Sequence, residues 1–348
     1  MNGRAIVMRL LLPLLLGVAV PADAAHAAKP FDEAVALYQS RHYEEAFRIA
    51  EKLAKEGHAE AQAMLGVLLE NGQGVKADPA QAARWYEKAA AQGHVGAMFA
   101  LAMLHLNGRL GSKDLQKALH WAQEAARRGH VPAQYNLGLL YTGVTGLKPD
   151  WKKAAYWFRQ AAEKGFAQAQ YNLGVLHVMG RGVEKDFTAA SEWFKKAALA
   201  GLPEAALEYG VLVFRGEGVA KSERIGAQWL EYAARSGHPA AQRRLARLYA
   251  TGRGVNKRPV EAAKWYLLAR AQGEKDAWLD LFLKHLPAAD LERAKALAAA
   301  FRPTKMRQIN TTTGGKTSLP RGNGRKPGGN GAAGAGGNGA GNGAKAKK

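Results

Sequence analysis

Histidine is the residue type in this chain with the widest capacity for metal binding or proton transfer, and ten are present. Four of them directly follow a glycine, at spacings of 36 residues or a multiple of 36: His58, His94, His130 and His238. Histidines that recur once per repeat are spread along the chain, so we expect them not to converge on one ion. No His-Glu-x-x-His motif and no nucleophile elbow is present. The sequence therefore predicts neither a catalytic site nor a metal site.

A second candidate for chemistry is the segment 310–317, Asn-Thr-Thr-Thr-Gly-Gly-Lys-Thr, which ends like a phosphate-binding loop. Asn310 occupies the place of the first glycine of that motif, and no predicted strand precedes it. Gly-x-Gly segments elsewhere lack the third glycine and the parallel sheet that dinucleotide binding needs. We therefore predict no cofactor and no enzyme activity.

The residues that do recur define a repeat of 36 residues. Its tryptophan and its closing glycine return at a fixed step, at Trp85, Trp121, Trp157, Trp193, Trp229 and Trp265, and at Gly93, Gly129, Gly165, Gly201, Gly237 and Gly273. A fixed period of about 20 to 50 residues is the signature of a solenoid of stacked units.

Each unit reads as a pair of helices, and the first unit serves as the example. Apolar residues spaced by three and four predict a first helix over 59–70, and the glycine-containing segment 71–75 ends it. Asp78 is the predicted cap and Pro79 the first residue of a second helix that runs to Gln92. In later units Ser222 keeps this capping capacity, whereas Arg258 does not.

Helices of this length are marginal alone in water, so packing between neighbours must stabilise them. The recurring tryptophans, Trp193 among them, are predicted to fill the gap between helices, while recurring alanines allow close approach. The predicted fold class is all-α.

Composition divides the chain into five parts. We predict a signal peptide over 1–28, an N-terminal capping helix pair over 31–57, six repeats over 58–273, C-terminal capping helices over 274–301, and a disordered basic tail rich in glycine, asparagine and lysine over 302–348.

The N-terminal segment has the composition of an export signal. An apolar run, Leu10–Val20, follows a short basic stretch and precedes two small-x-small cleavage sites, after Ala24 and after Ala27. The run is shorter than the roughly 20 residues that span a bilayer. We expect a periplasmic or secreted mature chain; the alternative is an uncleaved inner-membrane anchor with the repeats outside the cytoplasm. The chain has no cysteine, which excludes disulfides and a lipoprotein anchor.

About half of the formal net charge of +21 lies in the C-terminal tail, and residues 29–301 carry +10. The tail, residues 302–348, holds ten lysines and arginines and no acid. This charge is compatible with weak binding to an anionic glycan or lipid surface, or with a plain solvating linker. An exported chain is not expected to bind nucleic acid.

The complete unit resembles a Sel1-like repeat, a relative of the tetratricopeptide repeats. The resemblance rests on recurring segments of which one set is Ala169–Leu176, Gly180–Val183, Asp186, Trp193 and Ala197–Gly201. Ala102 and Ala246 depart from it by replacing a helix glycine. The resemblance implies a right-handed α/α superhelical solenoid that acts as an adaptor or scaffold for other proteins. Bacterial members are often exported and connected with envelope regulation, exopolysaccharide production or host interaction.

By the same resemblance, the first helices line a concave face that binds a partner. Its lining positions are Phe99, Tyr135, Asn136, Leu139, Tyr171, Asn172, Val175, Arg243, Arg244 and Arg247. The Tyr-Asn pairs serve either recognition or packing and backbone bonding. The three arginines interrupt that pattern and are predicted to recognise an acidic segment through bidentate contacts.

The hypothesis that follows is an exported, non-catalytic scaffold, with binding of an anionic glycan or envelope surface through the tail as the alternative. A penicillin-recognising hydrolase is a further alternative, because some exported Sel1-type proteins have been connected with that activity. The absence of a Ser-x-x-Lys motif speaks against it.

Overall fold

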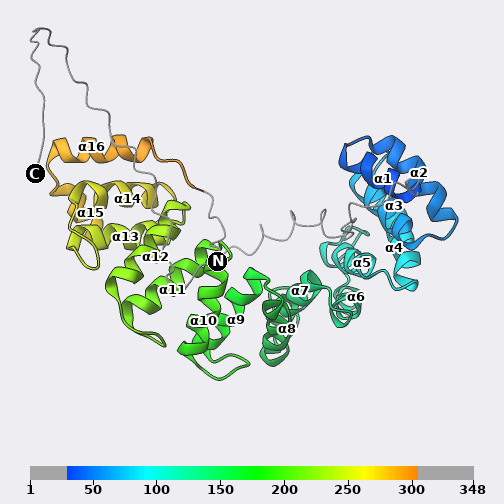
Figure 1. Ribbon diagram of the computed structural model, residues 1–348, viewed down its shortest axis with the longest axis horizontal. Helices are drawn as coiled ribbons and strands as arrows, with labels where there is room; N and C mark the ends of the chain where they lie inside the picture. The colour runs from blue at the N-terminus through cyan, green and yellow to red at the C-terminus, as the bar shows by residue number, and fades with distance from the viewer. Residues whose placement is uncertain (1–29, 305–348) are drawn as a thin grey trace, which may run out of the picture. The chain divides into compact units, whose positions relative to one another are not determined.

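The computed structural model describes residues 30–304, and this part of the chain contains sixteen α-helices and no strand (Figure 1). The all-α prediction is confirmed. In chain order the helices are α1 (Pro30–Gln39), α2 (Tyr43–Lys55), α3 (Ala59–Asn71), α4 (Pro79–Ala91), α5 (Val95–Asn107), α6 (Leu115–Arg127), α7 (Val131–Tyr141), α8 (Trp151–Glu163), α9 (Ala167–Met179), α10 (Phe187–Leu199), α11 (Pro203–Arg215), α12 (Glu223–Arg235), α13 (Pro239–Thr251), α14 (Pro259–Ala271), α15 (Ala277–Lys284) and α16 (Ala288–Ala299).

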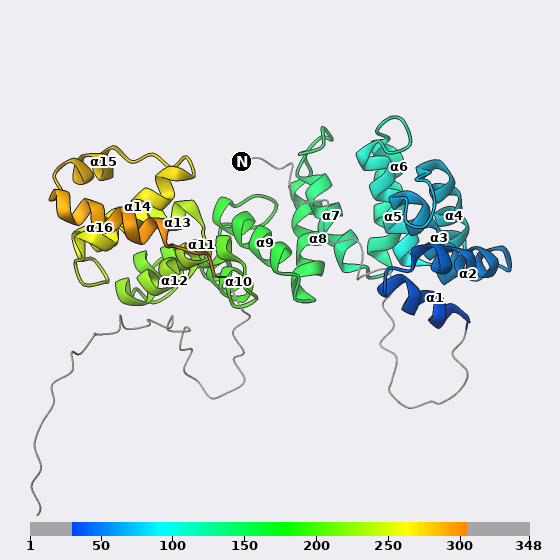
Figure 2. The same cartoon turned by 90° about the horizontal axis from the view of Figure 1, so that it is seen from above.

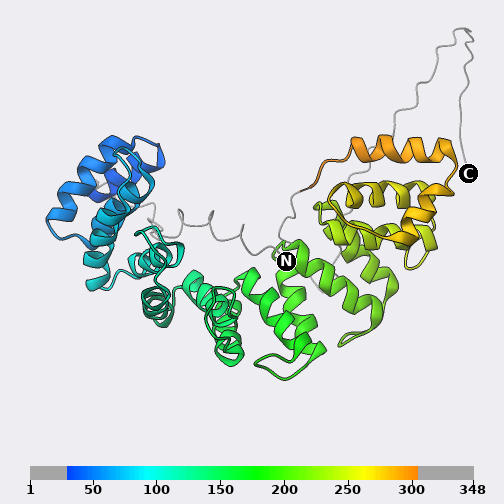
Figure 3. The same ribbon diagram turned by 180° about the vertical axis from the view of Figure 1, so that it is seen from behind.

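The helices pack in chain order, as a solenoid requires. Each first helix, from α3 to α13, contacts the second helix of its own repeat and the second helix of the preceding unit (Figure 2). The order changes only at the C-terminal end, where α14 packs mainly against α16 and only slightly against α15 (Figure 3). Because most contacts join helices that are neighbours in the chain, no single core spans residues 30–304.

A glycine on the first helix of four of the six repeats allows the two helices of the repeat to approach closely: Gly66, Gly138, Gly174 and Gly210. A Cβ atom at Gly174 of α9 would lie 2.7 Å from Cε1 of Phe194 on α10, closer than a carbon contact permits. The same relation holds for Gly66 with Tyr86 and Gly138 with Phe158. In the second repeat Ala102 and Ala122 occupy the two equivalent positions and both are buried. A small residue facing a large ring, or two small residues, thus fills the same space.

The recurring tryptophans are less buried than predicted. Trp85, Trp121, Trp157 and Trp193 are half-buried, and only Trp229 and Trp265 are buried. In most repeats the residue after the tryptophan fills the gap, as Phe194 does with 2 % of its surface exposed. Lys196 Nζ lies 4.2 Å from the centroid of the Trp193 ring, so a lysine side chain covers one face of that ring. The prediction that the tryptophan fills the gap is therefore correct at Trp229 and Trp265, whereas at Trp85, Trp157 and Trp193 the aromatic residue that follows is the buried one.

The capping predictions are confirmed. Asp78 Oδ1 accepts a hydrogen bond from the amide of Gln81 at 2.8 Å, and Ser222 caps α12 in the same way. Arg258 makes no side-chain cap at α14.

The Gly-x-Gly loops join one repeat to the preceding unit. The second glycine of the loop lies against the first residues of the previous second helix, where any Cβ would collide with backbone atoms: Gly74 against Tyr43, Gly182 against Trp151, Gly218 against Phe187 and Gly254 against Glu223. These glycines also have positive φ, which L side chains rarely adopt. In the second and third repeats, Gly111 and Gly146 have no neighbour within 4 Å of a Cβ position. Those two loops therefore lack the close contact between repeats.

Several predictions concern residues outside 30–304. The signal peptide over 1–28, the phosphate-loop-like segment 310–317 and nearly all of the tail over 302–348 lie outside the described part of the chain. Within 30–304, no helix has the length and apolar content needed to cross a membrane.

Candidate interaction surface

The histidines that follow the closing glycines are helix caps. They precede α3, α5, α7 and α13, and three of them accept a hydrogen bond through Nδ1 from the amide three residues on: His94 from Ala97 at 3.0 Å, His130 from Ala133 at 3.3 Å and His238 from Ala241 at 3.4 Å. Within residues 30–304, no group of three or more histidine or acidic side chains is placed to hold a metal ion.

Two of these caps are held neutral by their surroundings. Burial lowers the pKa of His130 to about 4, and the nearby His94 lowers it further. Burial also lowers the pKa of His94. The His130 ring packs 4.9 Å from the ring of Phe99, between centroids. A neutral imidazole can accept the amide hydrogen bond, whereas a protonated one cannot, so these caps require the deprotonated form.

The Tyr-Asn pair of α7 is engaged within its own repeat and the next one. The Tyr135 ring lies 5.9 Å from Phe158 and 5.0 Å from Phe166, between centroids. Asn136 Nδ2 donates a hydrogen bond to the carbonyl of Pro132 at 2.8 Å. Both side chains are half-buried. The ring contacts and the backbone hydrogen bond cover part of their surface, and the remaining part is accessible to a partner.

The corresponding pair on α9 is similar. The Tyr171 ring lies 5.7 Å from Phe194 between centroids, and burial, with Glu208 and Glu204 nearby, raises the pKa of Tyr171 to about 12. Asn172, Val175 and the Leu139 of α7 are also half-buried. Phe99 on α5 differs, because only 7 % of its surface is exposed.

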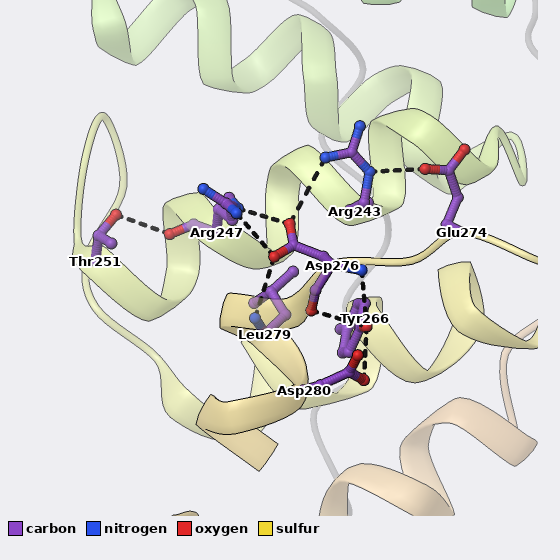
Figure 4. Close-up of polar contacts among 8 residues, drawn as sticks. All are labelled: Arg243, Arg247, Thr251, Tyr266, Glu274, Asp276, Leu279 and Asp280. Carbon is purple, nitrogen blue, oxygen red and sulfur yellow. Dashed lines mark hydrogen bonds and ion pairs between the residues drawn. The ribbon is translucent and has the colours of Figure 1, made fainter. Parts of the chain in front are cut away.

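Two of the three predicted recognition arginines pair with acids of the same chain (Figure 4). Arg247 donates from Nε and Nη2 to the two carboxylate oxygens of Asp276, at 2.6 and 2.8 Å. Arg243 Nε donates to Glu274 Oε2 at 2.7 Å, and its Nη1 lies 3.6 Å from Asp276 Oδ2. Bidentate contacts were predicted between these arginines and an acidic segment of a partner, whereas the structure shows them with acids of the same chain. An acidic partner would have to compete with Glu274 and Asp276 for the two arginines.

Asp276 is the centre of this cluster. Its side chain is 2 % exposed and also caps α15 by accepting from the amide of Leu279 at 3.2 Å. The hydrogen bonds from Arg247 lower its pKa, with further contributions from the Leu279 amide and Arg243. Tyr266 donates its hydroxyl to the Asp276 carbonyl and lies 2.7 Å from Asp280 Oδ1 (Figure 4). The cluster joins α13, α14 and α15.

Arg244 is the arginine without such a partner. Its Nε is buried and makes no hydrogen bond within the described part of the chain, and no ion pair joins Arg244 to an acid there. Burial lowers its pKa. Burial also raises the pKa of Glu208, the acid at the equivalent position one repeat earlier. Two half-buried opposite charges on adjacent first helices are therefore left without direct pairing.

The sequence reasoning missed Glu274, Asp276 and Tyr266. The available signal was positional, because both acids lie within three residues after the closing glycine Gly273 and so begin the unit that packs next to α13. Reading each first helix against the start of the following unit would have found them.

The model of the Sel1 repeat matches six consecutive segments of the chain: residues 59–94, 95–130, 131–166, 167–202, 203–238 and 239–274. No curated protein sequence matches the chain significantly.

Two solved structures are similar along most of the described helices. One is a protective antigen present in uropathogenic Escherichia coli strains that displays an SLR fold; it is 28% identical, with a TM-score of 0.68, over 84% of this chain and 65% of its own. This chain therefore spans slightly less than two thirds of that protein. The other is a Sel1 repeat protein from Oxalobacter formigenes, 31% identical with a TM-score of 0.60, over 70% of this chain and 99% of its own.

Proposed function

The chain belongs to the Sel1 repeat family, and we propose that it is an exported scaffold whose first helices bind another protein in the bacterial envelope. Proteins built from Sel1 repeats generally bind other proteins, and their solenoids are generally non-catalytic. A stack of helix pairs supports this role because it presents equivalent positions of successive first helices at regular intervals.

The observation that carries the proposal is the partial exposure of aromatic, amide and aliphatic side chains on α7 and α9. Tyr135 and Tyr171 are held by rings beneath them, so little side-chain entropy is lost when a partner packs on them. Leu139 and Val175 lie one helical turn further along the same helices and are also half-buried. Rigid aromatic residues with aliphatic neighbours are typical anchors of protein interfaces.

Arg244 of α13 occupies the repeat position that Asn136 has on α7 and Asn172 has on α9, so it continues this set of residues toward the C-terminal end. Arg244 is half-buried and no ion pair joins it to an acid within the described residues, so an acidic group of a bound protein can pair with it without displacing an existing partner. Arg243 and Arg247 would instead give up contacts with Glu274 and Asp276.

Site-specific photo-crosslinking in intact cells tests the proposal. A photo-reactive residue at Val175 is expected to capture one defined protein in the envelope. The matched control is Tyr156 on α8, a second-helix residue that is 55% exposed, which is expected not to capture that protein. Equal capture from both positions, or none from Val175, would contradict binding along the first helices.

Export is tested separately. Cell fractionation is expected to place the chain outside the cytoplasm and to show that removal of residues 1–28 abolishes this. Retention of residues 1–28 in a membrane fraction would support the anchored alternative. The proposed tail contact is tested by pull-down with and without residues 302–348, because loss of binding on tail removal alone would favour an anionic surface as the ligand.

A further inference from the structure

One position of the repeat changes from polar to charged along four consecutive first helices. It holds Asn136 on α7, Asn172 on α9, Glu208 on α11 and Arg244 on α13, and each of these residues is half-buried. We call these four residues the polar row. Because a solenoid presents equivalent positions at regular intervals, the polar row places an acid and a base on successive first helices, next to two amides.

The repeats stack in the same way on this side of the first helices. The residue that directly precedes a polar-row residue contacts the start of the next unit at two separate places. The Tyr135 ring lies 5.0 Å from that of Phe166, between centroids, and Arg243 Nε donates to Glu274 Oε2 at 2.7 Å. Both contacts join residues that are 31 positions apart. The third and sixth repeats therefore meet the following unit with the same geometry.

Two tyrosines lie close to the polar-row residue of the next first helix. Burial raises the pKa of Tyr135 on α7, and the side chain of Asn172 on α9 partly offsets that rise. Burial raises the pKa of Tyr171 on α9 to about 12, and the carboxylate of Glu208 on α11 adds to the rise. Asn172 and Glu208 therefore each have a polar neighbour on the preceding first helix.

Arg244 has no such neighbour, because Leu207 occupies the tyrosine position on α11. Within residues 30–304, the side chains of Glu208 and Arg244 make no hydrogen bond and no ion pair, either with each other or with another residue. Burial raises the pKa of Glu208 and lowers that of Arg244, and each charge partly offsets the effect of burial on the other. The two charges are therefore close enough to interact, but neither side chain is paired.

Both side chains retain bonding capacity for a ligand. The carboxylate of Glu208 has two acceptor oxygens, and the guanidinium of Arg244 has five N–H donors. Only Nε of Arg244 is enclosed, so its terminal Nη atoms are the donors that a ligand reaches. A half-buried charge has lost part of its hydration, so an opposite charge on a ligand stabilises it more than it would stabilise a fully exposed charge.

The spacing of the two charges selects the shape of the ligand. Neighbouring helices lie about 10 Å apart between their axes. A polyproline II segment has three residues per turn and rises about 3.1 Å per residue, so side chains three positions apart lie about 9 Å apart on the same edge. In a β-strand, side chains three positions apart point to opposite faces. A polyproline II segment is therefore the extended form that reaches both charges from one edge.

We propose that α11 and α13 bind an extended segment of a partner protein in which a basic and an acidic residue lie three positions apart. The basic residue pairs with Glu208 and the acidic residue with Arg244. Beyond Glu208 the segment reaches Asn172 and Asn136, whose amides can bond a peptide backbone. The inference rests on the proposed scaffold function and specifies the chemistry of its partner. A segment with charges of one sign is rejected, because one of its charges meets a like charge.

Four labelled proline-rich peptides test the proposal with the full chain. The first carries a lysine and an aspartate three positions apart, the second two lysines at that spacing, the third two aspartates at that spacing, and the fourth a lysine and an aspartate in adjacent positions. Fluorescence anisotropy is expected to show that the wild type binds the first peptide at least about tenfold more tightly than each of the others, because every mismatch loses a charge-assisted contact.

Two charge reversals are expected to change this preference in opposite directions. Glu208→Arg leaves two positive charges and should bind the two-aspartate peptide most tightly, whereas Arg244→Glu leaves two negative charges and should bind the two-lysine peptide most tightly. Tighter binding of a new peptide cannot result from unfolding, and circular dichroism verifies the fold.

Lys195→Glu is the matched control. Lys195 on α10 and Glu231 on α12 are also opposite charges 36 residues apart, but they belong to second helices. This substitution is expected to leave the peptide preference unchanged. A preference that follows Lys195→Glu as strongly as Glu208→Arg would show that the net charge of the chain selects the peptide, and would overturn the proposal.

Equal affinity of the wild type for the four peptides, or no detectable binding of any of them, would also overturn the proposal. So would a preference that neither Glu208→Arg nor Arg244→Glu changes. These outcomes leave the scaffold function intact if a photo-reactive residue at Val175 still captures a protein. Absence of that capture would instead contradict the scaffold function itself, so the two failures are distinguishable.

Discussion

The N-terminal and C-terminal first helices share a backbone but differ completely in the chemistry they present. At the positions of the Tyr-Asn pairs, α3 has Ala63 and Met64 and α5 has Phe99 and Ala100, all of them apolar. α13 has Arg243 and Arg244 at these positions and Arg247 one turn later, and two of the three arginines pair with acids of the following unit. The packing inside each repeat does not require either choice, so these positions are free to differ. Conserved geometry with variable chemistry is what a binding surface needs.

The largest effect on the free energy of unfolding is expected from a substitution in the packing between the two helices of a repeat. The comparison of the N-terminal and C-terminal first helices assumes that this packing is the same in both and that only surface residues differ. Phe194→Ala removes a ring that is 2% exposed and packs on Gly174, and is expected to cost about 4 kcal/mol of the free energy of unfolding. Urea denaturation followed by circular dichroism measures it.

The second repeat supplies the control for this prediction, because it has Ala102 and Ala122 at the two positions. Gly174→Ala alone is expected to be destabilising, since its Cβ would overlap the Phe194 ring. Together the two substitutions recreate the Ala-Ala pair and are expected to cost less than the sum of the single changes. Simple additivity would show that the second repeat is packed in a different way.

A somewhat smaller loss is expected from Asp276→Ala, which tests whether the C-terminal arginines are structural. The substitution leaves Arg247 and Arg243 without their shared acid and removes the cap of α15, at a cost of about 3 kcal/mol. Asp114→Ala removes an exposed cap that serves no arginine cluster of this kind and is expected to cost less. Equal effects of the two substitutions in urea denaturation would mean that the ion-pair cluster adds nothing.

Acid is expected to weaken the two regions in different pH ranges, because their key groups, His130 and Asp276, titrate in different ranges. The pKa of His130 is lowered to about 4, so between its usual value of 6.5 and about 4 the unfolded chain binds more protons than the folded chain. Stability from this cap is therefore complete above pH 6.5 and is lost as the pH falls to about 4, by roughly 2 kcal/mol after allowance for the exposed part of the ring.

The control is His130→Asn, which keeps a capping side chain that does not titrate and is expected to flatten the pH dependence over this window. The pKa of Asp276 is lowered, so the C-terminal cluster retains its contribution above pH 3.8 and loses it only below that value. Hydrogen exchange resolved by helix is expected to show α7 opening at a higher pH than α15. Simultaneous opening of both would contradict this assignment.

The smallest effect is expected from Arg244→Met. Its Nε makes no hydrogen bond within the described part of the chain, so an apolar side chain of similar length should change the free energy of unfolding by less than about 1 kcal/mol. Binding of the captured envelope protein is expected to weaken without loss of stability. A large loss of stability would instead make Arg244 a structural residue like Asp276.

The sequence by itself determined the period, the helix pairs, the caps and the family resemblance. These features are local or repeated: Asp78 caps the helix that it precedes, and glycines of positive φ end the helix that they follow. The same pattern of helix, loop, cap and helix recurs in six repeats, so each repeat supports the assignment made for the others. For this reason the all-α solenoid was predictable.

Only the tertiary structure decided which side chains meet. Trp193 and Phe194 are adjacent, and residues one apart on a helix point about 100° from each other, so a small rotation of the helix decides which is buried. The contacts of Arg247 with Asp276 and of Gly182 with the start of α8 join residues about 30 positions apart across two repeats. Such contacts depend on how repeats stack, and the pattern within a single repeat does not specify that.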